Sequence, residues 1–469
     1  MAGAEALNRL RSWLVSRALA LAAAFAVGGT APAAPPFAPA PAGTVIVYRG
    51  ADLIDGTGGP IRRDMAIVVE GKTIRRVLPS RDLARAGAAG ARIVDLSGYY
   101  VMPGLIDSHQ HLATPPDRRL AEAMMRRDLY GGVTAVRDMA DDLREVAVLT
   151  RKARAGEIAG PDIFYAALMA GRSFFDDPRT RLAAQGAVAG KVAWMQAIDQ
   201  ATDLRLAVAR ARGTGATAVK IYANLPAVLV RRIAAEAHRQ GLLVWAHAMI
   251  FPATPAEVVG AGVDSVSHVC YLAYQASPQR PSSYQGRFPV DYARFAGGDN
   301  AVMAALFRQM RRRGTLLDAT ERVYAEAERR AAANPGGKPF HCTAGLAARL
   351  INQAWRAGVA ISAGTDGFAG RDSLFPALHE ELLLLARKAG MPPAEVIRSA
   401  TLIGARAIGQ ERVMGTVAPG KLANLVVLAK NPLEDIANLN SIVFTIKRGR
   451  RFDRADYRPV TPQEMPDGQ

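Results

Sequence analysis

The chain has 469 residues, of which 50% are hydrophobic, 22% charged and 6% aromatic. This apolar content excludes a disordered chain, and the two cysteines, Cys270 and Cys342, exclude a disulfide-rich scaffold while leaving open whether they form one bridge. The formal net charge of +17 suggests a nucleic-acid or anionic-surface partner, although only nine of the 59 basic residues are lysine.

Residues 1–33 have the pattern of a secretory signal peptide. Three arginines precede an apolar run at 18–27, and small residues lead to an Ala31-Pro32-Ala33 exit. The run is shorter than the ~20 apolar residues that a membrane-spanning helix needs. We therefore expect a secreted or periplasmic protein without stable membrane insertion after signal removal. An uncleaved Ala/Pro tail is the alternative, and residues 34–43 are a Pro/Ala linker.

Short β-type runs lie near both ends of the remaining chain. The early runs cover 44–50, 65–71 and 91–98, and the late runs cover 425–428 and 442–446. Neither set is large enough for a sheet domain alone. We therefore expect one small β-sandwich domain formed by residues 44–102 and 412–455, followed by a C-terminal tail at 456–469.

The segment between them, residues 103–411, alternates between strand and helix patterns. The helical pattern at 227–241, for example, is amphipathic and ends at a glycine. Eight apolar runs are predicted strands, namely 104–111, 133–139, 162–168, 217–223, 242–248, 264–270, 314–320 and 359–366. Eight such βα units predict an α/β fold of the (β/α)8 TIM-barrel type. A doubly wound open sheet is the alternative, but no glycine-rich phosphate turn follows the first run.

Polar residues at the strand ends are the candidate site, because barrel enzymes place their chemistry at the carboxyl ends of the strands. His109 and His111 alternate on strand one, so they lie on one face and can share a metal ion. His247, His268 and Asp366 end strands five, six and eight. Four of the seven histidines thus fall at predicted strand ends, which favours a metal centre.

Lys220 lies inside the predicted fourth strand. A buried ammonium is costly unless it is paired or neutralised, and a lysine that extends its charged end outward past apolar neighbours is the alternative. A neutral buried lysine can react with carbon dioxide to form a carbamate, which is an anionic bridge for two metal ions. The chain uses lysine sparingly, and Lys220 precedes His247 by one βα unit, which favours the carbamate.

This set of residues resembles the metal-dependent amidohydrolase superfamily, and most closely its prolidase and imidazolonepropionase-like branch. The residues that carry the resemblance, in the order typical of the family, are His109, His111, Lys220, His247, His268 and Asp366. The motifs MPGLID at 102–107 and GTVAPGKLA at 415–423 support it over nearly the whole chain from 44 to 450. Asn424 departs from the aspartate more usual in the second motif, but it lies outside the site.

The resemblance implies two divalent metal ions, most often zinc. His109, His111 and Asp366 would hold one ion, and His247 and His268 the other. A carbamate on Lys220 and a hydroxide would bridge them. Attack of this hydroxide would cleave a carbon–nitrogen bond, amide or peptide-like, with Asp366 acting as general base and then as general acid.

The substrate-binding residues are less clearly marked. Tyr222, two residues beyond Lys220, could donate a hydrogen bond to a substrate carbonyl or carboxylate, and packing at the barrel rim is an equal alternative. Arg172 could bind a substrate carboxylate through its planar guanidinium, although a surface role is favoured. The long segments after strands three and six, including 171–178 and 271–300, are expected to shape the pocket.

Several alternatives remain. Mononuclear deaminases lack the strand-four lysine and commonly carry a glutamate soon after the strand-five histidine, whereas here the first acid after His247 is Glu257. A cyclic amide hydrolase, a lactonase or phosphotriesterase-like activity, or a basic binding protein with a catalytically dead barrel stay open.

The expected partner is a small-molecule substrate of the dipeptide or N-acyl amino acid class. No nucleic-acid partner is expected, because the arginines are scattered among acidic residues. A homo-oligomer is compatible with the sequence.

Overall fold

The computed structural model describes residues 34–86, 90–334, 336 and 340–466, and the chain from Pro36 onward forms one compact unit. The predicted signal peptide at 1–33 lies outside the described residues. None of the helices in the described part has the length and apolar content needed to cross a bilayer.

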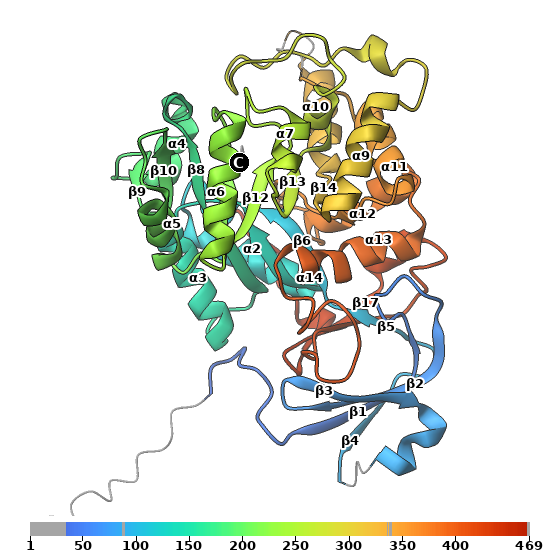
Figure 1. The fold of residues 1–469 in the computed structure, drawn as a ribbon. Helices are drawn as coiled ribbons and strands as arrows, with labels where there is room; N and C mark the ends of the chain where they lie inside the picture. Colours follow the sequence, from blue (N-terminus) through green and yellow to red (C-terminus); the bar gives the residue numbers. More distant parts are fainter. Residues whose placement is uncertain (1–33, 87–89, 335, 337–339, 467–469) are drawn as a thin grey trace, which may run out of the picture. The chain divides into compact units, whose positions relative to one another are not determined.

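The two ends of this unit meet in one eight-stranded sheet, as predicted (Figure 1). Its strands are β1 (Val45–Leu53), β2 (Arg62–Glu70), β3 (Thr73–Pro79), β4 (Arg92–Asp95), β5 (Tyr100–Pro103), β16 (Leu425–Leu428), β17 (Ile442–Lys447) and β18 (Arg450–Asp453). The antiparallel pairing of β16 with β5 joins the late strands to the early ones, with Val426 opposite Met102. Irregularities in β1 shift its register with β2. The sheet has its own apolar core, in which the ring centroids of Tyr48 and Phe444 are 6.3 Å apart.

The eight predicted barrel strands are confirmed, and they pair in parallel in chain order. They are β6 (Leu105–Gln110), β7 (Val133–Asp138), β8 (Asp162–Gly171), β11 (Ala218–Ile221), β12 (Leu243–His247), β13 (Ser265–Ser267), β14 (Leu316–Asp318) and β15 (Ile361–Ser362). The segments after β15 reach back to β6, because the Ser108 amide donates to the Ala363 carbonyl at 2.8 Å and the Asp366 amide donates to the His109 carbonyl at 2.9 Å. The barrel is thus nearly closed.

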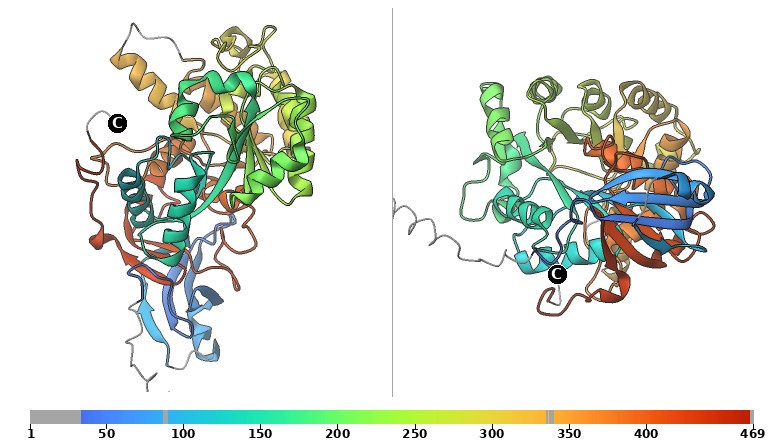
Figure 2. Two further views of the ribbon diagram at one scale, coloured as in Figure 1. Left: turned by 90° about the vertical axis from the view of Figure 1, so that its left-hand side faces the viewer. Right: turned by 90° about the horizontal axis from the view of Figure 1, so that it is seen from below.

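Helices surround the barrel, as Figure 2 shows from two further directions. They are α2 (Arg118–Tyr130), α3 (Leu143–Ala155), α5 (Leu204–Gly213), α6 (Ala227–Arg239), α7 (Pro255–Gly260), α9 (Ala301–Arg313), α11 (Ala344–Arg356), α12 (Ala377–Arg387), α13 (Pro393–Ser399) and α14 (Leu402–Ala407). The predicted helix at 227–241 corresponds to α6, which buries an apolar stripe that includes Leu229 and Ile233 and is followed by Gly241 at φ 78°.

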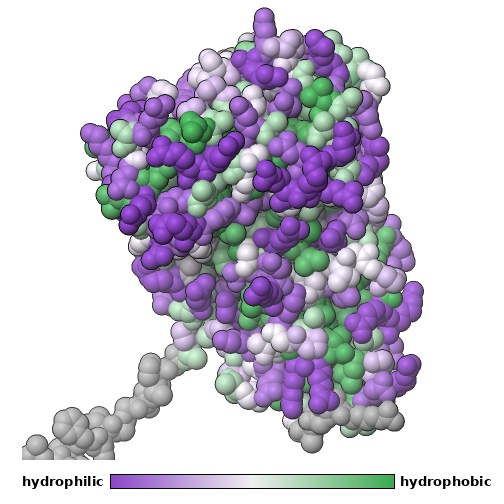
Figure 3. Space-filling view, viewed as in Figure 1, coloured by the Kyte–Doolittle hydropathy of each residue, from purple (hydrophilic) through white to green (hydrophobic). Residues whose placement is uncertain are grey.

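Short elements lie in the segments that connect the barrel strands and helices. They are η2 (Arg172–Asp176), α4 (Pro178–Ala184), β9 (Lys191–Val192), β10 (Met195–Ile198), α8 (Val269–Ala273), η3 (Tyr292–Phe295) and α10 (Glu321–Ala333), while η1 (Ser80–Ala86), η4 (Ile436–Asn440) and η5 (Arg454–Asp456) adjoin the terminal sheet. The face drawn in Figure 3 is mostly hydrophilic, with hydrophobic side chains in small groups, as expected when the apolar residues are used inside.

Candidate metal centre and substrate cavity

The barrel brings the predicted metal ligands from four strand ends to one place. Asp366 Oδ1 lies 3.4 Å from His109 Nε2 and 3.3 Å from His111 Nε2, and Asp366 Oδ2 lies 3.8 Å from His268 Nδ1. The rings of His247 and His268 are 4.9 Å apart. His268 and Asp366 adopt positive φ angles of 71° and 46°, a strained backbone that is typical of functional sites.

Two carboxylates that the sequence analysis did not single out hold the first pair of histidines. His109 Nδ1 is 2.7 Å from Asp318 Oδ2, and His111 Nδ1 is 2.7 Å from Asp141 Oδ1. Each contact occupies the Nδ1 atom and turns Nε2 of the same ring toward Asp366. Carboxylates placed behind metal-binding histidines in this way orient the ring and raise its basicity.

Asp318 also links His109 to the buried Arg137 and, through Ser267, to Lys220. Its carboxylate accepts a hydrogen bond from Ser267 Oγ at 2.7 Å and lies 2.9 Å from Arg137 Nη2, and both charged side chains have no exposure. Ser267 Oγ in turn accepts from Lys220 Nζ at 3.2 Å. Asp318 lies at the end of the seventh barrel strand, β14. It could therefore have been predicted by the argument that selected the polar residues at the other strand ends.

Lys220 is fully buried inside the barrel. Burial lowers the pKa of its amine to about 7, and the nearby Asp318 charge opposes this only in part. A substantial fraction of the side chain is therefore neutral near physiological pH. The alternative in which the charged end extends outward to solvent is wrong for this residue.

The donor set has the residue types that bind a divalent cation. Nε2 of His109 and of His111 are turned toward Asp366, while His247 Nδ1 is buried without a hydrogen-bond partner among the described residues. Ligand atoms of His109, His268 and Asp366 lie within 4.8 Å of one another. Burial alone would raise the pKa of Asp366, but the surrounding histidines outweigh it and hold the pKa well below its usual range, so the carboxylate is ionised.

A cavity of about 380 Å³ opens beside these residues. Outside the candidate metal ligands, its wall includes six aromatic residues, two arginines and a histidine; these are Phe174, Tyr222, Tyr271, Tyr284, Tyr324, Phe340, Arg179, Arg287 and His341. Tyr222 lines this cavity, and its ring centroid lies 4.0 Å from that of His247. Most of the other wall residues come from the long segments, where sequence alone shows no periodic pattern to locate them.

Arg172 does not reach the cavity. Its side chain is 75% exposed and pairs with Asp199 at 2.6 Å. The guanidinium lies in the turn that follows β8, where an acidic neighbour on the surface already satisfies it. The surface role of Arg172 is the one that the structure supports.

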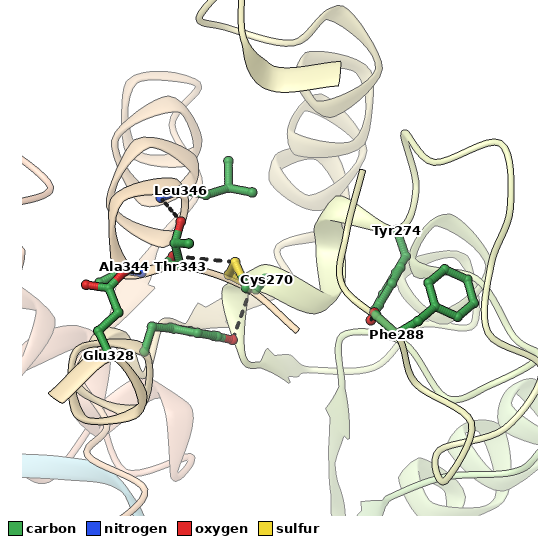
Figure 4. The surroundings of a disulfide bond; sticks show 9 residues. Cys270, Tyr274, Phe288, Glu328, Thr343, Ala344 and Leu346 are labelled. Carbon is green, nitrogen blue, oxygen red and sulfur yellow. Dashed lines mark hydrogen bonds between the residues drawn. A yellow bond between two sulfur atoms is a disulfide. The ribbon is translucent and has the colours of Figure 1, made fainter. Parts of the chain in front are cut away.

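Cys270 and Cys342 form a disulfide, with Cα atoms 6.1 Å apart (Figure 4). Cys270 follows His268 by two residues, and Cys342 follows the cavity residue His341 directly. The Cys270 amide also contacts the cavity wall, because it donates a hydrogen bond to the Tyr324 hydroxyl at 3.2 Å. The bridge therefore ties two parts of the cavity wall together.

Comparison with known proteins identifies the family of the chain. Residues 100–452 match the protein-family model described as "Amidohydrolase family". The chain belongs to the amidohydrolase family. Members of this family are metal-dependent, and this amidohydrolase is a hydrolase that acts on carbon–nitrogen bonds.

Two relatives of this amidohydrolase place it in the predicted branch. It is 28% identical over 432 residues to imidazolonepropionase of Anaeromyxobacter sp. (strain K), covering 83% of this chain and 90% of the relative. It is 27% identical over 445 residues to ochratoxinase of Aspergillus niger, covering 83% and 82%.

The fold is shared with solved structures. The crystal structure of A. niger ochratoxinase superimposes with a TM-score of 0.69 at 22% identity, covering 89% of this chain and 99% of the other. A Xaa-Pro dipeptidase with bound methionine gives a TM-score of 0.67 at 21% identity, covering 87% and 100%.

Proposed function

We propose that this amidohydrolase uses two divalent metal ions to hydrolyse an amide or peptide-like bond in a dipeptide or an N-acyl amino acid. The observation that carries the proposal is the fully buried Lys220, whose amine has a pKa of about 7 and lies in the same barrel interior as the four histidines. The similarity to a Xaa-Pro dipeptidase and to imidazolonepropionase supports a substrate with a carbon–nitrogen bond.

The chain's donors divide into two sets. His109, His111 and Asp366 would hold one ion, and His247 and His268 the other. When bound, the ions would polarise the scissile carbonyl and lower the pKa of water toward neutrality; zinc is our first choice.

Lys220 would supply the bridging anion. Its neutral amine attacks carbon dioxide, forming a nitrogen–carbon bond and releasing one proton, so that an ammonium-forming group becomes a carbamate. This removes the cost of burying an amine and adds the negative charge that two cations need. Ser267 Oγ, 3.2 Å from Nζ, orients the side chain.

Asp366 would move the proton. Because its carboxylate is ionised and contacts both His109 and His111, it can accept a proton from water at Oδ1 and return it to the leaving nitrogen. Tyr222 stands beside His247 on the cavity wall and could donate its hydroxyl to the substrate.

A mononuclear deaminase is disfavoured by the region after His247. The first acid there, Glu257, caps α7: its Oε2 accepts from the Thr254 amide and from the Thr254 hydroxyl, each at 2.9 Å. This carboxylate is committed to the helix N-terminus and cannot serve as the proton-transfer group of a deaminase without breaking the cap.

The test is a metal count combined with a substrate screen. Protein purified with zinc and bicarbonate is expected to hold two ions per chain, to show a carbamate carbon by ¹³C NMR after ¹³C-bicarbonate labelling, and to hydrolyse dipeptides or N-acyl amino acids. Lys220→Met should abolish the carbamate signal and lower the metal count. One ion per chain with unmodified Lys220 would reverse the proposal toward a deaminase, and activity only on lactones or phosphotriesters would overturn the amide assignment. A folded protein that binds no metal under these conditions would favour the dead-barrel alternative.

We also infer that the protein is exported, on the basis of the signal pattern at 1–33. Amino-terminal sequencing of protein from the periplasm or the medium should begin close to Ala34. Retention of Met1 on cytoplasmic protein would contradict this inference.

A further inference from the structure

Arg287 is a cavity residue that the metal chemistry does not use. It lies between α8 and η3, and its guanidinium carbon stands 3.3 Å from the Tyr284 ring centroid and 5.8 Å from that of Tyr271. Both rings line the cavity together with Arg287. Arg287 Nη1 is buried and has no hydrogen-bond partner among the described residues. A buried charged donor of this kind calls for an acceptor.

The backbone on both sides of Arg287 is held in place. The Tyr284 amide donates to Asn224 Oδ1 at 2.8 Å, and the Tyr274 hydroxyl donates to the Phe288 carbonyl. Figure 4 shows Tyr274 and Phe288 side by side in the segment that follows Cys270. Arg287 is thus presented to the cavity from an ordered segment, which reduces the entropy lost when it binds a ligand.

The two cavity arginines differ in their ion pairs. The other cavity arginine, Arg179, forms an ion pair with Asp177 at 2.7 Å, whereas Arg287 has no ion pair within the described residues. Asp366 is the one acid in the described cavity wall, and it belongs to the metal centre. Burial alone would raise the pKa of Tyr284, but Arg287 and Arg179 outweigh it and lower that pKa, as expected beside an uncompensated cation.

We propose that Arg287 binds the substrate's carboxylate and that the enzyme therefore selects amides carrying a free carboxylate and an uncharged side chain. This inference rests on the proposed amide hydrolysis. A guanidinium matches a carboxylate with two parallel hydrogen bonds, and stacking on Tyr284 fixes its plane. Phe174 and Phe340 offer apolar surface to the side chain. A lysine or arginine side chain would instead meet Arg179 and Arg287, so dipeptides with a basic C-terminal residue are disfavoured.

The experiment compares matched substrates with and without the carboxylate. The fastest substrate of the screen is tested against the same amide lacking its carboxylate; for N-acetylleucine this is N-(3-methylbutyl)acetamide. Arg287→Gln is expected to raise KM for the carboxylate substrate about tenfold to a hundredfold, with kcat and zinc content little changed. Its kcat/KM for the amide without a carboxylate should equal that of the wild type. Arg287→Lys should recover part of the lost affinity, because it keeps the charge but loses the paired hydrogen bonds.

Arg294→Gln is the matched control. Arg294 lies in the same segment, is 54% exposed and faces Asp291, so the same loss of charge should leave both substrates unaffected. Equal wild-type rates with and without the carboxylate, or an equal loss on both substrates in Arg287→Gln, would overturn the role of Arg287 while leaving the amide hydrolysis intact. Faster cleavage of N-acetylarginine than of N-acetylleucine would overturn the charge selection. Absence of hydrolysis across the whole screen would instead overturn the proposed function, and the role of Arg287 with it.

Discussion

Asp318 contacts both the buried Arg137 and the candidate metal ligand His109, so replacing it by asparagine should change both stability and metal affinity. Its carboxylate contacts His109 Nδ1 at 2.7 Å, Ser267 Oγ at 2.7 Å and Arg137 Nη2 at 2.9 Å. Asparagine keeps the shape of the side chain but removes its charge. Asp318→Asn should therefore leave Arg137 as an unpaired buried cation and weaken the hold on the His109 ring.

The two effects have separate magnitudes. Breaking a fully buried ion pair by removing one partner costs about 3–5 kcal/mol of unfolding free energy. Arg137 keeps its other contacts, to the Ser108 carbonyl, to Ser265 Oγ at 2.8 Å and to the Trp245 ring at 4.8 Å, so we expect the lower part of this range, near 3 kcal/mol. Loss of a carboxylate behind a metal-binding histidine typically lowers metal affinity about 10–100-fold.

Chemical denaturation of the metal-free protein measures the first effect, and zinc titration against a competing chelator measures the second. The double variant Arg137→Met/Asp318→Asn removes the unpaired cation and should recover most of the stability, but none of the zinc affinity. Wild-type zinc affinity in Asp318→Asn would refute the assigned role toward His109. A double variant no more stable than the single one would refute the account of the ion pair.

Three further changes probe other parts of the structure. Asp141→Asn should lower zinc affinity about 10–100-fold, because Asp141 holds His111 Nδ1 at 2.7 Å, as a chelator titration would show. Asp128 is buried, and burial together with the charge of a neighbouring aspartate raises its pKa from 3.8 to about 7. Between pH 3.8 and about 7 the unfolded chain releases a proton that the folded chain keeps, so the free energy of unfolding falls as pH rises. Asp128→Asn should remove up to about 4 kcal/mol of that fall. Denaturation curves recorded from pH 4 to 8 measure it. Replacing Cys270 and Cys342 together by serine opens a bridge that spans 72 residues and should cost up to about 4 kcal/mol of unfolding free energy.

The pH prediction and the disulfide prediction each have a control. Asp372 is 94% exposed, so Asp372→Asn should leave the pH dependence of stability as it is in the wild type. The same pH slope in Asp128→Asn and in the wild type would contradict the raised pKa. The serine variant should unfold like the wild type when the wild type is measured in reductant, and a difference there would show that the cysteines contribute by packing rather than by the bridge.

The barrel and the candidate metal ligands could be predicted from the sequence. Strand runs end where apolar alternation stops, and in a parallel barrel all the carboxyl ends meet at one face. His109, His111, His247 and Asp366 could therefore be brought together without coordinates. The terminal sheet followed from the same reasoning, since two strand sets too small to stand alone must pair.

Local pattern and the shared geometry of strand ends thus determined the fold, the ligand positions and the candidate role of Lys220. The tertiary structure decided which side chains meet across the barrel and across the long segments. Asp318 and His109 are 209 residues apart in the chain yet 2.7 Å apart in space, and no periodicity links them. For the same reason Arg172, which follows the predicted third strand by four residues, lies on the surface, while Arg287 from an irregular segment lines the cavity. Contacts of irregular segments depend on the whole chain's packing, because such segments have no repeat that fixes the direction of a side chain.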